Sequence, residues 1–126
     1  DWSTDFTDQW TTQAMRYAQR VPSLGIPSRT KGVVELYDAA TDWIPIYDKS
    51  SLPGFYMACG TSGNQYKNAP VAGRLMAALI DYCEGGGDHD AEPLRFRFDH
   101  IGHEISAGFF SRKREINTDS SFSVLG

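Results

Sequence analysis

Hydrophobic residues recur every three or four positions near the start of the chain. The stripe consists of Phe6, Trp10, Ala14, Tyr17 and Val21. This spacing is typical of one face of an amphipathic helix, so we predict a helix over residues 5–20. Pro22 cannot continue the helix, and the breaker-rich segment 23–30 that follows is predicted to be a connector.

Three short segments after the connector have strand-like patterns. Residues 31–40 alternate between two faces, which predicts a half-buried strand. Residues 43–47 favour a strand, although Pro45 removes a donor and indicates an edge or an irregular strand. Residues 54–59 show little alternation, as expected for a strand covered on both faces.

A second helix is predicted over residues 70–84, with Pro70 in its first turn. Few charges interrupt its apolar residues, which favours a mostly buried helix. One of its faces carries a row of small residues: Ala69, Ala72, Gly73 and Ala77. Such a row allows close approach of a flat cofactor, or simply tight packing on a sheet.

The remainder of the chain is predicted to be less regular. Residues 85–90 form a glycine-rich break, residues 94–98 alternate like a short strand, and residues 108–126 are expected to be a largely irregular tail. The predicted fold class is therefore α+β or α/β, with a small sheet and two helices. The length of residues 1–126 suits a single domain of ordinary size.

Composition narrows the classes of function. The 126 residues are 40% hydrophobic with a net charge of −4, which indicates a packed core and disfavours a nucleic-acid groove. No apolar run is long enough to span a membrane and no signal peptide is recognisable, so we expect a cytoplasmic protein. Cys59 and Cys83 are expected to be free, buried thiols.

The segment between the predicted strand at 54–59 and the helix at 70–84 carries the candidate chemistry. Gly60 and Gly63 permit positive φ angles, so the loop can turn its backbone N–H groups toward one point ahead of the helix. Such a point suits an anionic or electron-rich group. Lys67 adds a cation just outside the helix.

This segment resembles the C-terminal flavin-contacting motif of the FAD-dependent D-amino-acid oxidase, glycine oxidase and sarcosine oxidase superfamily. The family's G-x-S-G-x-x-x-K loop is matched by Gly60-Thr61-Ser62-Gly63-Asn64-Gln65-Tyr66-Lys67. The match continues through Asn68-Ala69-Pro70, and residues 35–38 and 42–46 resemble the family's final strands. The resemblance covers roughly residues 29–84.

The resemblance implies FAD as cofactor and oxidation of a C–N bond by hydride transfer to flavin N5. The residues it places beside the flavin ring are Gly60, Thr61, Ser62, Gly63, Asn64, Gln65 and Lys67. The loop amides would stabilise the negative charge of the reduced ring. We assign no catalytic side chain and expect no metal ligand in this chain.

For the substrate, the resemblance implies that Lys67 holds a carboxylate, as in sarcosine-oxidase-like members. Glycine-oxidase-like members carry arginines where this chain has Tyr37 and Gly63, so a sarcosine- or dimethylglycine-like amine is expected. Tyr37 is a candidate substrate-binding residue in the pocket, or else an ordinary sheet residue.

The N-terminal G-x-G-x-x-G fingerprint that holds the FAD pyrophosphate in such enzymes does not occur in this chain. We therefore expect a C-terminal portion, inactive alone, whose partner is the N-terminal portion of the same enzyme. Exposed apolar surface and self-association would follow.

Two further classes are weighed. A non-catalytic assembly domain is the main alternative, and a small hydrolase is disfavoured because Ser62 lacks the G-x-S-x-G context. His89 between two aspartates, and the pair His100 and His103, are not expected to bind a metal; His89 is predicted to lie in a solvated turn. Residues 112–114 are predicted to be a solvated charge run.

Overall fold

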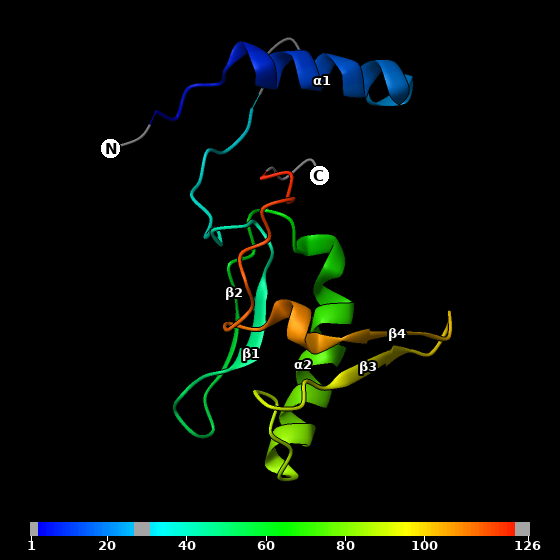
Figure 1. The fold of residues 1–126 in the computed structure, drawn as a ribbon. Coiled ribbons are helices and arrows are strands. Elements are labelled where there is room, and N and C mark those ends of the chain that lie inside the picture. Colours follow the sequence, from blue (N-terminus) through cyan, green and yellow to red (C-terminus); the bar gives the residue numbers. More distant parts are fainter. Residues whose placement is uncertain (1–2, 27–30, 123–126) are drawn as a thin grey trace. The chain divides into compact units, whose positions relative to one another are not determined.

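The computed structural model describes residues 3–26 and 31–122. The chain divides into two compact units, one ending at Leu36 and one beginning at Tyr37. Within the described ranges the structure is mixed α+β, with two α-helices and two small antiparallel sheets, as predicted (Figure 1). None of these helices is both long and apolar enough to cross a membrane. That the whole chain is one portion of a larger enzyme stays a prediction.

The first unit is built around α1 (Asp8–Arg20), which confirms the predicted N-terminal helix. Its N-cap is Thr7, whose side chain accepts a hydrogen bond from the amide of Trp10 at 3.2 Å. The helix ends at a 3₁₀ turn over Pro22–Leu24. No residue of α1 is buried, so the first unit covers the apolar stripe of this helix only in part.

The second unit contains the hairpin of β1 (Ile46–Lys49) and β2 (Tyr56–Cys59). Tyr47 pairs with Ala58 in an antiparallel register. The strand predicted at 54–59 is thus present in shorter form. The strand predicted at 43–47 is displaced along the chain, because β1 shares only residues 46 and 47 with it and continues through residue 49. β1 begins one residue after Pro45, which agrees with the inability of proline to donate to a ladder.

The strand predicted over residues 31–40 is wrong. The segment has no strand, and its sheet-like pairing among the described residues is limited to an isolated bridge between Ala39 and Thr61. Alternating polarity favours a strand only where another strand offers its backbone groups for pairing. Within the described residues, no strand pairs with residues 31–38.

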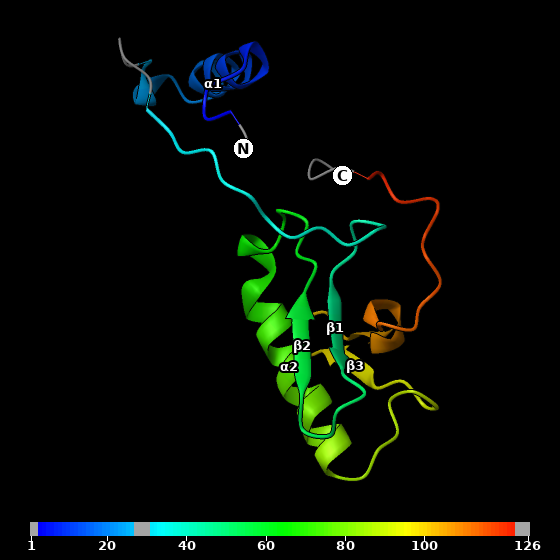
Figure 2. The ribbon, with the colours of Figure 1, turned by 90° about the vertical axis from the view of Figure 1, so that its left-hand side faces the viewer.

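α2 (Ala69–Glu84) confirms the second predicted helix and packs along β1, beside the hairpin in Figure 2. The prediction that this helix is mostly buried is wrong, because only Leu75 and Leu79 of its residues are buried. Two small residues of the opposite side, Gly73 and Ala77, are exposed. Within the described residues of the second unit, no further layer covers that side.

The end of β2 is also exposed to solvent. Its last two residues, Ala58 and Cys59, are exposed although the apolar run predicts cover on both faces. The prediction of two buried cysteines is therefore wrong: Cys59 is exposed and Cys83 on α2 is half-buried, while both are free thiols as predicted.

A second hairpin completes the core. β3 (Arg95–Phe98), predicted from its alternation, pairs with β4 (His103–Ser106), and a 3₁₀ helix follows over Ala107–Phe110. The buried apolar cluster takes one residue from each of β1, α2, β3 and the 3₁₀ helix: Tyr47, Leu75, Phe96 and Ala107. As predicted, the described tail beyond Phe110 forms no helix or strand.

Candidate functional site

An apolar cavity of about 470 Å³, here called the aromatic pocket, lies beside the start of α2. Its apolar walls come from the segment 43–47, the first turns of α2, the second hairpin and the 3₁₀ helix. The aromatic lining residues are Trp43, Tyr47, Phe96, Phe98, Phe109 and Phe110. Three amide side chains, those of Asn64, Gln65 and Asn68, also line it.

The turn that leads into α2 is held in left-handed backbone conformations. Gly60, Ser62 and Gly63 have φ angles of 65°, 52° and 73°. Ser62 is 1% exposed, and its hydroxyl donates to the Gly60 carbonyl at 3.1 Å while accepting from the Ala40 amide at 3.2 Å. The sequence predicts positive φ angles at Gly60 and Gly63. The two hydrogen bonds of the buried Ser62 hydroxyl additionally hold the turn in this conformation.

Asp38 occupies the position that the loop was predicted to offer to an electron-rich ligand. Its carboxylate accepts hydrogen bonds from the Gly60 amide and, at 2.6 Å, from the Thr61 hydroxyl, while its backbone carbonyl accepts from the Ser62 amide at 2.8 Å. The bond from Thr61 lowers the pKa of Asp38. The amides of Gly60 and Ser62 therefore do not form an open cradle, which corrects the expectation of freely presented amides.

Asn64 and Gln65 are the two predicted site residues that line the aromatic pocket. The Asn64 amide donates to the Thr61 carbonyl at 3.1 Å, which holds the turn in place. The Tyr47 hydroxyl donates to the side-chain oxygen of Gln65. The pocket thus has a polar edge in an otherwise apolar wall.

Lys67 and Tyr37 do not line the aromatic pocket. Lys67 lies in the 3₁₀ turn Tyr66–Asn68, immediately before α2, with its side chain exposed. Tyr37 is 53% exposed and makes an edge-to-face contact with Trp43, a residue that lines the pocket. The structure therefore brings Asn64 and Gln65 together at the pocket, with Lys67 and Tyr37 outside it.

A buried ionic cluster was missed by the sequence. Asp48 on β1 has no exposed surface and accepts hydrogen bonds from the Ser111 hydroxyl at 2.9 Å and from the Arg112 side chain at 3.0 Å. Arg112 also binds Asp90 through both terminal nitrogens, at 2.9 and 2.8 Å. The predicted solvated charge run at 112–114 is therefore wrong for Arg112, and also for Arg114, which binds buried Asp42.

His89 belongs to the same cluster and is 1% exposed, so its predicted place in a solvated turn is also wrong. Its Nε2 lies 3.7 Å from Oδ1 of Asp48. Within the described ranges, no group of three or more His, Cys, Asp or Glu side chains is arranged to hold a metal ion. Asp88 and Asp90, which flank His89, are a weak sequence signal that His89 is buried, because a buried titratable side chain needs charged or polar partners.

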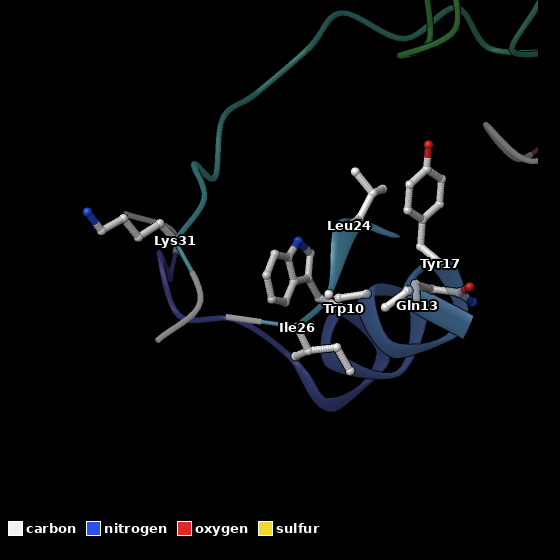
Figure 3. A pocket seen from close by; sticks show the side chains of 9 residues that line it. Trp10, Gln13, Tyr17, Leu24, Ile26 and Lys31 are labelled. Carbon is white, nitrogen blue, oxygen red and sulfur yellow. The ribbon is translucent and has the colours of Figure 1, made fainter. Parts of the chain in front are cut away.

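The first unit has a groove of its own, of about 430 Å³. Figure 3 shows its labelled lining residues, which come from α1 and the segment after it: Trp10, Gln13, Tyr17, Leu24, Ile26 and Lys31. The groove carries few polar groups and no candidate chemistry. The aromatic pocket of the second unit is therefore the better candidate site.

Neither the aromatic pocket nor the turn beside it can be assigned by similarity. Comparison of the chain with protein-family models, with curated proteins and with solved structures finds no match.

Proposed function

We propose that this chain is the C-terminal portion of an FAD-dependent oxidoreductase that oxidises the C–N bond of a small amine or amino acid of sarcosine or glycine type. One observation carries the proposal: the turn whose residues resemble a flavin-contacting loop opens onto an aromatic pocket. Asn64 and Gln65 belong to both. The proposal further assumes an N-terminal portion that supplies the dinucleotide-binding site.

The chemistry of the pocket suits a flat ring with a polar edge. Ligand pockets are mostly apolar, with a few polar groups that fix orientation, and here three amide side chains border six aromatic ones. Because Asp38 occupies the amides of Gly60 and Ser62, the proposal assigns ring contact to Asn64 and Gln65. FAD, when bound, supplies a hydride acceptor at its N5 atom.

Lys67 is proposed to bind the substrate carboxylate. Its ammonium stands on a flexible four-carbon stem in the turn before α2, three residues beyond Asn64. A cation near the N-terminus of a helix is mildly unfavourable because of the helix dipole, and an anionic ligand would offset that cost. Tyr37 is proposed to stand nearby as a wall or hydroxyl donor, with its ring fixed against Trp43.

The uncovered surfaces of the second unit support a larger assembly. Exposed apolar residues lie on β2 and on α2: Ala58, Cys59, Val71 and Ala77. We propose that this exposed apolar surface contacts another protein portion. The N-terminal portion of the same enzyme is the proposed partner.

The test uses the protein expressed from its whole coding region, purified with its natural cofactor. We expect a flavin absorbance that bleaches when sarcosine or glycine is added without oxygen. Lys67→Ala should raise KM for the carboxylated amine about tenfold, the effect of losing roughly 1.4 kcal/mol of binding free energy. Lys31→Ala, which removes another exposed lysine, is the matched control. A purified protein without flavin, or a flavin that no such amine bleaches, would refute the proposal.

A non-catalytic assembly domain is the second candidate, favoured by the same uncovered surfaces. It predicts stable self-association of the 126-residue chain without any flavin. Because a C-terminal enzyme portion is also expected to self-associate, the flavin content of the protein expressed from its whole coding region separates the two proposals: the assembly domain predicts an assembled protein that contains no flavin.

A further inference from the structure

His89 is buried and hydrogen-bonded on one side only. Its Nδ1 accepts the backbone N–H of Leu94 at 3.1 Å. An imidazole nitrogen that accepts a hydrogen bond carries no proton, so the neutral ring holds its proton on Nε2. Among the described residues, Nε2 has no hydrogen-bond partner, because Oδ1 of Asp48 at 3.7 Å is too distant.

Several charged or titratable groups surround this ring. They are Asp48 and Lys49 on β1, Cys83 on α2, Asp88 and Asp90 beside His89, and Arg112 and Lys113 in the tail. Asp48 is already balanced by Arg112 and by the Ser111 hydroxyl. The cluster therefore has little uncompensated negative charge with which to stabilise a histidinium.

A second proton on His89 must go to Nδ1, since Nε2 already carries one. Protonation would then remove the acceptor of the Leu94 amide and place two N–H groups against each other. Leu94 directly precedes β3, and its carbonyl accepts the amide of Ala107 at 2.8 Å, just after β4. Leu94 is thus the point where both ends of the second hairpin are fastened.

We propose that His89 is a pH-sensitive latch: the neutral imidazole fastens the β3–β4 hairpin at Leu94, and protonation releases it. The hairpin supplies Phe96, Phe98 and Ile105 to the wall of the aromatic pocket. Release would therefore loosen that wall. The latch does not depend on the proposed flavin function, because its readouts need no cofactor.

The direction of the pH effect follows from the environment of the ring. Burial is the main cause that lowers the pKa of His89 below 6.5; Asp48 and Asp90 oppose the shift, and Lys49 and Arg112 add to it. A base with a lowered folded-state pKa binds more protons when unfolded. The stabilisation is therefore complete above pH 6.5 and is lost as the pH falls from 6.5 toward the folded-state pKa.

Hydrogen exchange of the full 126-residue chain tests the latch. Protection of the Leu94 and Phe96 amides, relative to that of buried Leu79 on α2, should fall about tenfold for each unit by which the His89 pKa is lowered, between about pH 7.5 and pH 5. His89→Asn keeps an acceptor near Leu94 but does not titrate. Its relative protection should not change with pH.

His103→Asn serves as the matched control, because His103 is exposed on β4 and should leave the pH dependence intact. A wild-type chain without pH-dependent protection at Leu94, or an equal dependence in His89→Asn, would overturn the latch. Should His89→Asn fail to fold, nitrogen NMR of the wild-type imidazole decides: a proton on Nε2 near pH 7.5 supports the latch, and one on Nδ1 contradicts it.

Discussion

Arg114 reaches back 72 positions along the chain to hold the carboxylate of Asp42 by two hydrogen bonds, of 3.0 and 2.6 Å. Asp42 has no exposed surface. Its oxygens also accept the amides of Ile44 at 3.2 Å and Asn117 at 3.3 Å. A tail without helix or strand is in this way fastened to the start of the first hairpin.

Arg114→Ala should therefore destabilise the chain strongly. The substitution leaves a buried carboxylate without its cation, which typically costs about 3–5 kcal/mol. Urea denaturation of the wild-type protein and of Arg114→Ala measures the difference in their free energies of unfolding. Arg95→Ala is the control: Arg95 pairs with Glu104 at 2.8 Å, but both side chains are largely exposed, so a loss of less than about 1 kcal/mol is expected. Equal losses would contradict the anchoring of the tail.

The same pair makes stability depend on pH in the acid range. Hydrogen bonding from Arg114 lowers the pKa of Asp42 from 3.8 to about 2. The unfolded chain then binds the proton more readily, so this stabilisation is complete above pH 3.8 and is lost as the pH falls to about 2. Asp42→Asn should remove this part of the slope in a series of urea titrations. An unchanged slope in the variant would assign the acid sensitivity to other carboxylates.

Two glycines should respond in opposite ways to alanine. Gly60 has a φ of 65°, and a Cβ there would lie 3.1 Å from Cβ of Ala40. Gly60→Ala should therefore destabilise by roughly 1–2 kcal/mol. Gly73 lies inside α2 with no atom within 4 Å of an added Cβ, so Gly73→Ala should stabilise by up to about 1 kcal/mol. Thermal unfolding ranks the two variants, and a reversed order would be inconsistent with the turn geometry.

Local signals predicted the regular elements well. Pro70 and the apolar run behind it predicted α2, and the stripe containing Trp10 predicted α1. Both rest on contacts within a few residues of one another. Gly60 and Gly63 likewise predicted a left-handed turn, because positive φ angles are a property of the residue itself.

Distant contacts explain the errors. Residues 31–38 alternate in polarity but have no partner strand in the described structure, and alternation does not reveal a missing partner. His89 and Arg112 look like solvated surface residues in the sequence, because Asp48, which contacts both, lies far away along the chain on the first hairpin. Asp38, which closes the amides of the turn, comes from 22 positions upstream and carries no local mark of that role.

Of the residues that line the aromatic pocket, the sequence singled out only Asn64 and Gln65 as candidate site residues. Asn64 and Gln65 belong to the loop singled out in the sequence, whereas Phe96, Phe98 and Phe110 reach the pocket through the second hairpin and the 3₁₀ helix after it. Aromatic residues in short strands serve equally as core, so their type alone does not distinguish a wall from a core residue. Only the folded arrangement assigns them to the site.

The most direct test of the central proposal follows the side-chain amide signals of Asn64 and Gln65 by NMR. The protein expressed from its whole coding region is freed of flavin and then titrated with FAD. If a flavin ring enters the aromatic pocket, both signals shift in step with recovery of the flavin spectrum, while the signal of Asn117, in the tail, stays in place. Recovery of the spectrum with unchanged Asn64 and Gln65 signals, or no recovery at all, would contradict the account.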